Sequence, residues 1–530
     1  METRQVGIQK GVPSSQSYDP DTSIKYNLPY NDGNFYGRKQ IIINASLQDF
    51  YENPLEIIKE NISYILSTHK QNVEEMEYLR NYYRGKQDIL EKVRSNGEQK
   101  INNKHVTNYA WEYVNFKKGY YVGKPIKYVD INEEKYNDIK YLNCYLRDVK
   151  KPSKDLVKYE NMLITGIAYT MTIPNKKNYN IEFESPFTYT VLDNKDVCVV
   201  RSNDVYKTKL FTMYISTLVD KESGTDYKVY VIYYDDEFIE VTHKSEEMYI
   251  SDSGKMPVYE CITEYQLNEQ RMGVFEPILS ALNSLNNITS NQLDQLEEMV
   301  NSYLTFENVD ISELVKNIDE FRRKRILAVE TNNPETPAKI GSIKIENEHS
   351  SINNKYKEIE QRNYDIIGVP MPTSSTGQGV SGEAQVYGGG WENAQIIALV
   401  DTQYILQYEQ EDLNKFIYIS KDKANSKTPN LYSSNLEIKY TINKSNNMMV
   451  KAQSMTYFID KGFTREQALT FCEITDDPQS DGKTADENYI KQKEIDLELE
   501  LKRTKAIKEL NKEEDSNKDT EIKKEVEEKE

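Results

Sequence analysis

The stretch FEPILSALNSLNNITSNQLDQLEEMV, residues 275–300, predicts an amphipathic helix. Apolar residues recur every three or four positions, the spacing of one helix face, and polar residues fill the other side: Ile278, Leu282, Leu285, Ile288, Leu293, Leu296 and Val300 form the apolar face. A second helical stretch, SSINNKYKEIEQRNYDIIGVP, occupies 350–370, and a small α+β insertion lies between the two. This order predicts two antiparallel helices that bracket a small domain.

The chain between 163 and 265 changes period. Short β-branched and aromatic runs such as FTYTVLD, VCVVRS and YKVYVIYYD are separated by turn residues. They favour an antiparallel meander in an α+β fold over a parallel α/β core. Helical patterns dominate 46–95, with Gly85 as a break, and a long helix (391–420), a strand (435–442) and a small helical unit (447–475) follow the glycine-rich stretch. Thr464 is a candidate N-cap in that unit.

Composition restricts the class of protein. The 530 residues suffice for several domains, and a net charge of −19 argues against tight adsorption of the whole molecule to DNA or anionic lipid. The four cysteines and four histidines are scattered, which predicts neither a disulfide framework nor a metal site. We find no apolar signal-peptide core and no apolar run near 18 residues, so we expect no membrane span and assembly in the cytoplasm.

The stretch SSTGQGVSGEAQVYGGGW, residues 374–391, contains a G-x-G-x-x-G spacing at Gly377, Gly379 and Gly382. A dinucleotide site needs a strand directly before this motif, and Pro370 and Pro372 oppose a central strand there. The sequence also lacks a phosphate-binding P-loop and a nucleophile elbow. We therefore expect no cofactor and no catalysis. No charged side chain occurs from 368 to 382, which indicates a neutral loop between two helices.

Four longer segments stand out between about residues 75 and 480. They are LRNYYRGKQDIL with NNKHVTNYAWEYVNFKKGYYVGKPIKY, then GKMPVYECITEYQLNEQRMGVFEPILSALNSLN, YDIIGVPMPTSSTGQGVSGEAQVY, and SMTYFIDKGFTREQALTFCEITDDPQSD. Together, and in this order, they resemble the portal proteins of tailed double-stranded-DNA bacteriophages, in the form found in phages of Gram-positive bacteria. Each motif is loose alone, but the ordered set is specific.

The resemblance implies a division of the chain into named parts. An N-terminal flexible arm (1–40) precedes an α/β wing (41–270), and the antiparallel stem comprises 271–300 and 349–367 around a small α+β clip (301–348). The remaining parts are a tunnel loop (368–382), a long kinked helix with the return to the wing (383–446), a helical crown (447–500) and a disordered tail (501–530). Glycines 388–390 would either kink the long helix, delay its start to Trp391, or extend the loop.

The resemblance also implies a function. Portal subunits form a closed ring, usually of twelve copies, at one capsid vertex of the virion. The ring would be the conduit for packaging and ejection of double-stranded DNA and the docking site for the terminase large subunit and the head–tail adaptors. Scaffold and major capsid protein would be further partners, and the terminase would supply the energy. The alternatives are a head–tail adaptor or other virion structural protein without a DNA channel, and an enzyme acting on nucleic acid.

Three sets of candidate residues follow. The neutral channel loop could contact DNA through short-lived hydrogen bonds, and comprises Thr373, Ser374, Ser375, Thr376, Gly377, Gln378, Gly379 and Val380. The second stem helix has cations that would either contact DNA weakly or form ion pairs between subunits: Lys355, Lys357 and Arg362. The clip has a basic run that would be a motor-docking patch, a DNA-entry patch or a solvated helix end: Arg322, Arg323, Lys324 and Arg325.

Overall fold

The structure is a computed structural model. It describes residues 37–93, 101–131, 136–175, 184–219, 224, 226–244, 247–256, 258, 260–300, 303–307, 339–343, 349–371, 390–422, 431–440, 448–472, 474–475 and 478–527. The chain divides into two units, Met1–Asn443 and Lys444–Glu530. Both helices and sheets build the first unit, which confirms the predicted α+β class.

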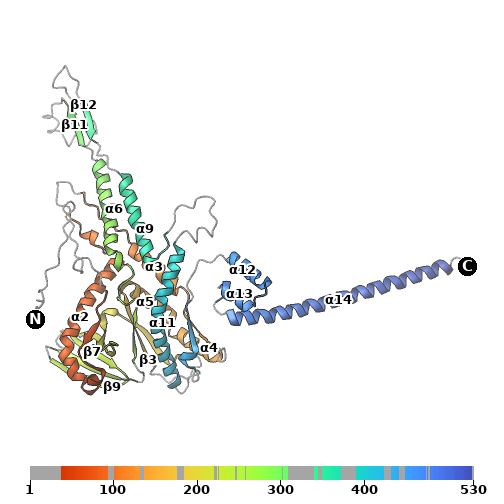
Figure 1. Cartoon of the computed structure of the whole chain (residues 1–530), viewed down its shortest axis with the longest axis horizontal. Helices are drawn as coiled ribbons and strands as arrows, with labels where there is room; N and C mark the ends of the chain where they lie inside the picture. The colour runs from red at the N-terminus through yellow and green to blue at the C-terminus, as the bar shows by residue number, and fades with distance from the viewer. Residues whose placement is uncertain are drawn as a thin grey trace, which may run out of the picture. The chain divides into compact units, whose positions relative to one another are not determined.

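Along the first unit, helices are interspersed among the strands (Figure 1). Ser46 directly precedes α1 and forms a reciprocal capping box with Asp49 in the first turn of that helix. This capping explains why the helix begins there. Gly85 has a φ of +87° and follows the end of α2, as predicted for a helix break. The helices are α1 (Leu47–Glu52), α2 (Pro54–Tyr83), α3 (Tyr109–Val122), α4 (Tyr136–Asp148), α5 (Lys151–Thr165), α6 (Leu279–Val300), α9 (His349–Ile367) and α11 (Trp391–Asp422).

The predicted antiparallel meander is confirmed by a six-stranded sheet. Its strand order is β1-β5-β6-β7-β8-β9, in which β5 to β9 pair antiparallel in chain order and β1 is added parallel to β5. The strands are β1 (Ile41–Ile43), β5 (Val197–Ser202), β6 (Lys209–Val219), β7 (Asp226–Tyr234), β8 (Glu237–Lys244) and β9 (Glu247–Lys255). The helices α1 and α2 share a core with this sheet, in which the Phe50 ring stacks 5.0 Å from that of Phe211.

Two smaller sheets complete the body. An antiparallel sheet of order β10-β3-β4 comprises β3 (Ile167–Pro174), β4 (Phe187–Leu192) and β10 (Ile262–Gln266). It packs on α11, where the rings of Phe187 and Phe416 stack 4.7 Å apart. The expected strand at 435–442 is present as β13 (Leu436–Lys439), and it pairs with β2 (Lys127–Asp130).

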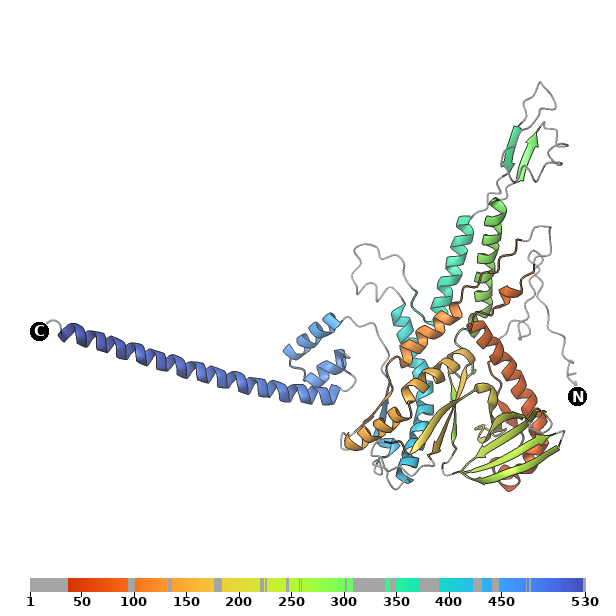
Figure 2. The ribbon, with the colours of Figure 1, turned by 180° about the vertical axis from the view of Figure 1, so that it is seen from behind.

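The helices α6 and α9 lie side by side and antiparallel (Figures 1 and 2). Leu282 and Tyr364 share one core, and further along Gln292 donates a hydrogen bond to Asn353 at 3.1 Å. Residue numbers therefore rise on α6 as they fall on α9. Beyond them, β11 (Tyr303–Glu307) and β12 (Lys339–Ile343) form an antiparallel pair. This arrangement confirms the helix pair that the sequence predicts, whereas residues 308–338 of the expected α+β insertion lie outside the described residues.

The first described residues correct the boundary of the flexible arm, which we placed at residue 40. The Arg38 side chain is buried and forms ion pairs with Glu75 and Glu276, and the Arg38 backbone N–H donates to the Arg271 carbonyl at 3.1 Å. The Lys39 N–H donates to the Asn72 side chain at 2.8 Å. A buried guanidinium requires such partners, so residues 37–40 belong to the folded body.

The second unit is helical, with α12 (Met448–Asp460), α13 (Arg465–Cys472) and α14 (Pro478–Glu527). The predicted N-cap is confirmed, since Thr464 Oγ1 accepts from the Gln467 N–H at 3.2 Å and Gln467 Oε1 accepts from the Thr464 N–H at 3.1 Å. The side chains of α14 are exposed from 486 to 508, in keeping with a solvated tail. The helix α14 itself ends at Glu527.

Candidate functional site

Polar side chains hold α6 along its length, in addition to its apolar face. Tyr82 Oη donates to the Asn283 side chain at 2.9 Å, and the buried Lys92 ammonium lies 2.8 Å from Asp294. Burial would raise the pKa of Asp294, but hydrogen bonds from Lys92 and Asn103 outweigh it and lower that pKa. The polar side of α6 is therefore partly buried: Asn283, Asn286, Ser290 and Asp294. The helical spacing of these four polar residues was the feature of the sequence that could have indicated a second buried face.

A row of tyrosines joins α9 to α3. Tyr109 Oη donates to Glu360 at 2.6 Å and is 2.8 Å from Tyr356 Oη. Tyr364 Oη donates to Glu112 at 2.8 Å. Burial raises the pKa of Tyr364, and the hydrogen bond to Glu112 raises it further, so this phenol stays a donor. These bonds fix α9 on the body, and they fix the direction in which its exposed cations point.

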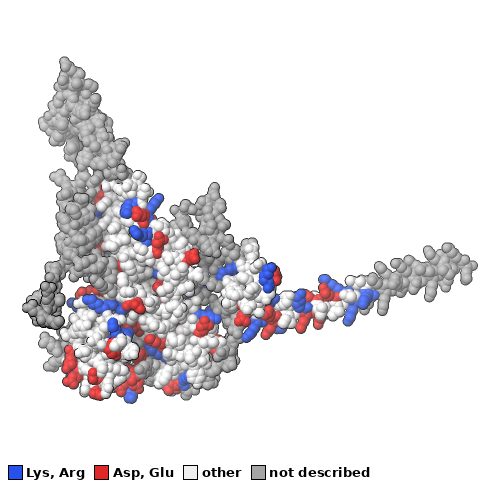
Figure 3. Space-filling view, in the orientation of Figure 1, with Lys and Arg blue, Asp and Glu red and all other residues white. Residues whose placement is uncertain are grey.

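The three predicted stem cations all lie exposed on α9, but they do not share one side. At about 100° per residue, Lys355 and Arg362 are two turns apart on one flank, and Glu358 lies between them. Lys355 forms an ion pair with Glu358 at 3.1 Å. Lys357 lies on the other flank, beside the uncharged Asn354 and Gln361. Figure 3 shows basic and acidic side chains gathered over α9.

The long helix predicted after the glycine-rich stretch is α11, and the structure shows at which residue it begins. Gly390 has a φ of +79°, in the left-handed region, and its carbonyl accepts from the Ala394 N–H at 3.0 Å. The helix therefore begins at Trp391, because the positive φ of Gly390 is incompatible with the interior of a right-handed helix. The Trp391 ring packs on those of Phe116 and Tyr120 of α3. Gly388 and Gly389 lie outside the described residues.

The inner face of α11 carries charges that the sequence analysis did not identify as buried. The Glu409 side chain is fully buried and accepts from both Lys151 and Lys158 of α5. Asp155 completes the group through ion pairs to the same two lysines at 2.8 and 3.1 Å. The group has a net charge of zero. Asp401 also lies within α11 and forms an ion pair with Lys117 at 3.3 Å.

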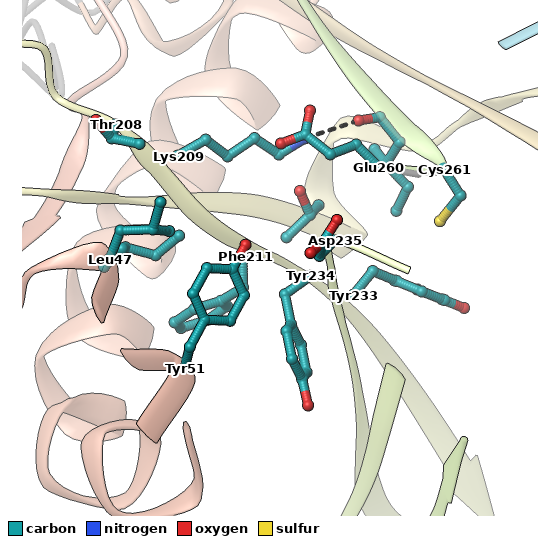
Figure 4. A pocket seen from close by; sticks show the side chains of 13 residues that line it. Leu47, Tyr51, Thr208, Lys209, Phe211, Tyr233, Tyr234, Asp235, Glu260 and Cys261 are labelled. Carbon is teal, nitrogen blue, oxygen red and sulfur yellow. Dashed lines mark hydrogen bonds and ion pairs between the residues drawn. The ribbon is translucent and has the colours of Figure 1, made fainter. Parts of the chain in front are cut away.

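A pocket of about 110 Å³ lies between α1 and the sheet (Figure 4). Lys209 and Glu260 form an ion pair at 3.6 Å on its wall, and burial raises the pKa of Asp235. Nucleotide-sized ligands need about 300 Å³ or more, so this pocket suits a few water molecules. Among the residues that the structure describes, no group of three His, Cys, Asp or Glu side chains is placed to hold a metal ion.

The arrangement is thus a braced antiparallel helix pair with exposed polar flanks and a small insertion at its far end. A scan against protein-family models matches residues 62–388, more than half of the chain, to the family described as phage portal protein, SPP1 Gp6-like. The chain belongs to the phage portal family. This match runs from α2 through α9 and takes in both helices of the pair. A search among curated proteins found no match.

Membership in the portal family implies an oligomeric ring and a place in the virion capsid. Of the predicted site residues of this portal, the structure describes the three cations of α9. The loop Thr373 to Val380 and the basic run Arg322 to Arg325 lie outside the described residues. Within the part of the portal chain that is described, every helix is too short or too polar to cross a membrane.

Proposed function

We propose that this portal protein forms the ring through which double-stranded DNA is packaged and ejected. The observation that supports this best is the α6–α9 pair. Lys92 and Asp294 brace α6, and the hydrogen bonds of Tyr109 to Glu360 and of Tyr364 to Glu112 brace α9 on α3. A channel under load requires wall elements that do not rotate or bend away. Buried ion pairs and hydrogen bonds supply that rigidity here, and no catalytic step is assigned to the chain.

The parts of the chain take the following roles in this proposal. Residues 41–270 and 383–446 form the wing, α6 and α9 the stem, 301–348 the clip, 368–382 the tunnel loop and 447–500 the crown. The clip, with Arg322 to Arg325, would dock the terminase large subunit and later the head–tail adaptors. Scaffold and major capsid protein would contact the ring from the capsid side. The support for these roles is the family match and the helix–insertion–helix order.

The two flanks of α9 suit different partners. A channel should touch DNA without gripping it, because each cation on a phosphate releases counterions and adds affinity. The flank with Asn354, Lys357 and Gln361 offers one cation beside two neutral side chains, and Asp365 lies one turn beyond Gln361, from which it accepts a hydrogen bond at 3.1 Å. We propose that this flank faces DNA. The flank with Lys355, Glu358 and Arg362 mixes both signs and suits ion pairs with a neighbouring subunit.

The ring itself is the first test. We expect the purified chain to form rings of about a dozen subunits in electron micrographs, with an axial hole wide enough for a duplex of about 20 Å. Mass photometry of the same sample should give a matching mass. A ring without a through-channel would favour a head–tail adaptor, and a chain that stays monomeric at every salt concentration would contradict the proposal.

The flank assignment gives a sharper prediction. In rings carrying Lys357→Gln, the slope of log affinity for DNA against log salt concentration should fall by about one for each phosphate that no longer meets a cation. Ring stability should stay unchanged in this variant. Arg362→Gln is the matched substitution on the other flank: it should leave the slope unchanged and lower the salt concentration at which rings dissociate. The reverse pattern would exchange the two flanks.

A further inference from the structure

The outer face of α11 carries no charge between Asn393 and Gln407, although Glu392 just before it is exposed. Between Asn393 and Gln407, four apolar side chains are well exposed: Ile396 (56%), Leu399 (48%), Val400 (54%) and Tyr404 (38%). The other exposed residues of this segment are Asn393, Gln403 and Gln407. We call these seven residues the α11 stripe. In a chain with 29% charged residues, an exposed helical face of this length without a charge indicates a surface that another molecule covers.

The stripe cannot be buried by rotation of α11. Trp391 packs on Phe116 and Tyr120, Asp401 pairs with Lys117, and Glu409 is held by two lysines of α5, all on the opposite face. These contacts extend over the whole segment. The stripe therefore faces outward from its own body as a permanent feature, and only a second molecule or another part of the chain could cover it.

The chemistry of the stripe excludes some occupants. DNA requires cations to meet its phosphates, and the exposed residues of the stripe include none. The stripe instead suits a surface that is itself apolar and neutral, as at the core of a subunit interface.

The geometry of the proposed ring indicates which molecule covers the α11 stripe. The start of α11 lies against the end of α9, where the Asn393 side chain donates to the Asp365 carbonyl at 3.2 Å. If α9 lines the channel, α11 begins close to the ring axis. At a radius of about 20 Å, twelve copies leave about 10 Å between equivalent points, which is the distance at which helices pack. Elements at that radius have a neighbouring copy within contact distance.

We propose that the α11 stripe is a subunit–subunit interface that seats against a second copy of this chain in the ring. This inference rests on the proposed function and adds to it the surface that closes the ring. Because successive subunits meet through unlike patches, the stripe contacts a different surface of the next copy, and its disruption should affect every interface of the ring.

The test compares charge insertions at matched positions on α11. Val400→Asp places a carboxylate within the stripe, and burying it against an apolar surface should raise the concentration at which rings half-dissociate by about tenfold or more. Gln403→Glu changes charge without changing shape and should act in the same direction. Asn414→Asp is the control, because it adds the same charge to an exposed site two turns beyond the stripe, and it should leave rings unchanged. Circular dichroism of each variant checks that the subunit is folded.

A second readout does not depend on destabilisation. A photo-crosslinking residue at position 400 should yield a covalent dimer in rings and none in dissociated subunits. If unmodified chains form rings, while Val400→Asp and Gln403→Glu rings dissociate like the control and position 400 yields no dimer, the stripe is not the interface and the proposed function stands. If the unmodified chain forms no ring, both proposals fail together.

Discussion

Glu409→Gln should destabilise the folded body around α11 and α5 by about 3–5 kcal/mol, because it leaves two buried lysines with one carboxylate. In the native protein the Glu409 side chain is fully buried, lies 3.0 Å from Lys151 and also contacts Lys158. Asp155 balances only one of the two positive charges. The amide can accept a hydrogen bond but supplies no charge. Urea unfolding at neutral pH, followed by circular dichroism, measures the destabilisation.

Glu392→Gln is the matched control, since Glu392 lies exposed at the start of the same helix. It should change the free energy of unfolding by less than about 0.5 kcal/mol. Equal unfolding midpoints for the Glu409 and Glu392 variants would show that the buried group contributes nothing to stability. The control also excludes a general effect of removing acidic residues from α11.

The contribution of Glu409 depends on pH. Burial alone would raise the pKa of Glu409, but Lys151 and Lys158 outweigh burial and lower that pKa to about 2. The unfolded value is about 4.3. A depressed carboxyl pKa stabilises the fold above the unfolded value, and this stability is lost as the pH falls toward the folded value. The difference between wild type and Glu409→Gln should therefore be largest at neutral pH and shrink between about pH 4 and pH 2.

Much of the fold is predictable from local patterns. The apolar spacing from Leu282 onward identifies α6, and the short β-branched runs identify β5 to β9, because each pattern reflects which side of one element is buried. Gly85 and Thr464 mark helix ends through chemistry that acts within a few residues.

The missed features depend on partners far away in the chain. Glu409 is one acidic residue among many on a long helix, and its two lysines lie about 250 residues earlier. Asn283 and Asp294 look like a solvent face until the segment that contains Lys92 covers them. The three cations of α9 were identified, but their division between two flanks becomes visible only once Tyr356 and Tyr364 show which side of α9 is buried.

Gly166→Ala should have an effect comparable in size to that of Glu409→Gln, for a steric reason. Gly166 follows α5 with a φ of +82°, and a Cβ atom there would lie 2.2 Å from the Arg271 carbonyl oxygen. The obstacle is backbone and cannot rotate away. The left-handed conformation costs about 1–2 kcal/mol and the overlap a further 1–3 kcal/mol, so we expect a total destabilisation of about 2–5 kcal/mol. Urea unfolding measures this effect as well.

Gly85→Ala separates the two causes. Gly85 also follows a helix, with a φ of +87°, but a Cβ atom there would meet nothing nearer than Asn108 at 3.7 Å. This control should show only the conformational part of the destabilisation, about 1–2 kcal/mol. Equal destabilisation of the two variants would show that the backbone at Arg271 can move aside.

The position of Gly166 gives the substitution a consequence for assembly. The Gly166 carbonyl accepts from the Leu267 N–H at 3.0 Å, and the Leu163 carbonyl accepts from the Val274 N–H at 2.8 Å. These bonds hold the segment that leads directly into α6. Displacing that segment would tilt the proposed channel wall relative to the wing, so Gly166→Ala subunits that still fold should form fewer closed rings than Gly85→Ala subunits of the same concentration. Equal ring yields would show that α6 keeps its direction when the backbone at Gly166 is displaced.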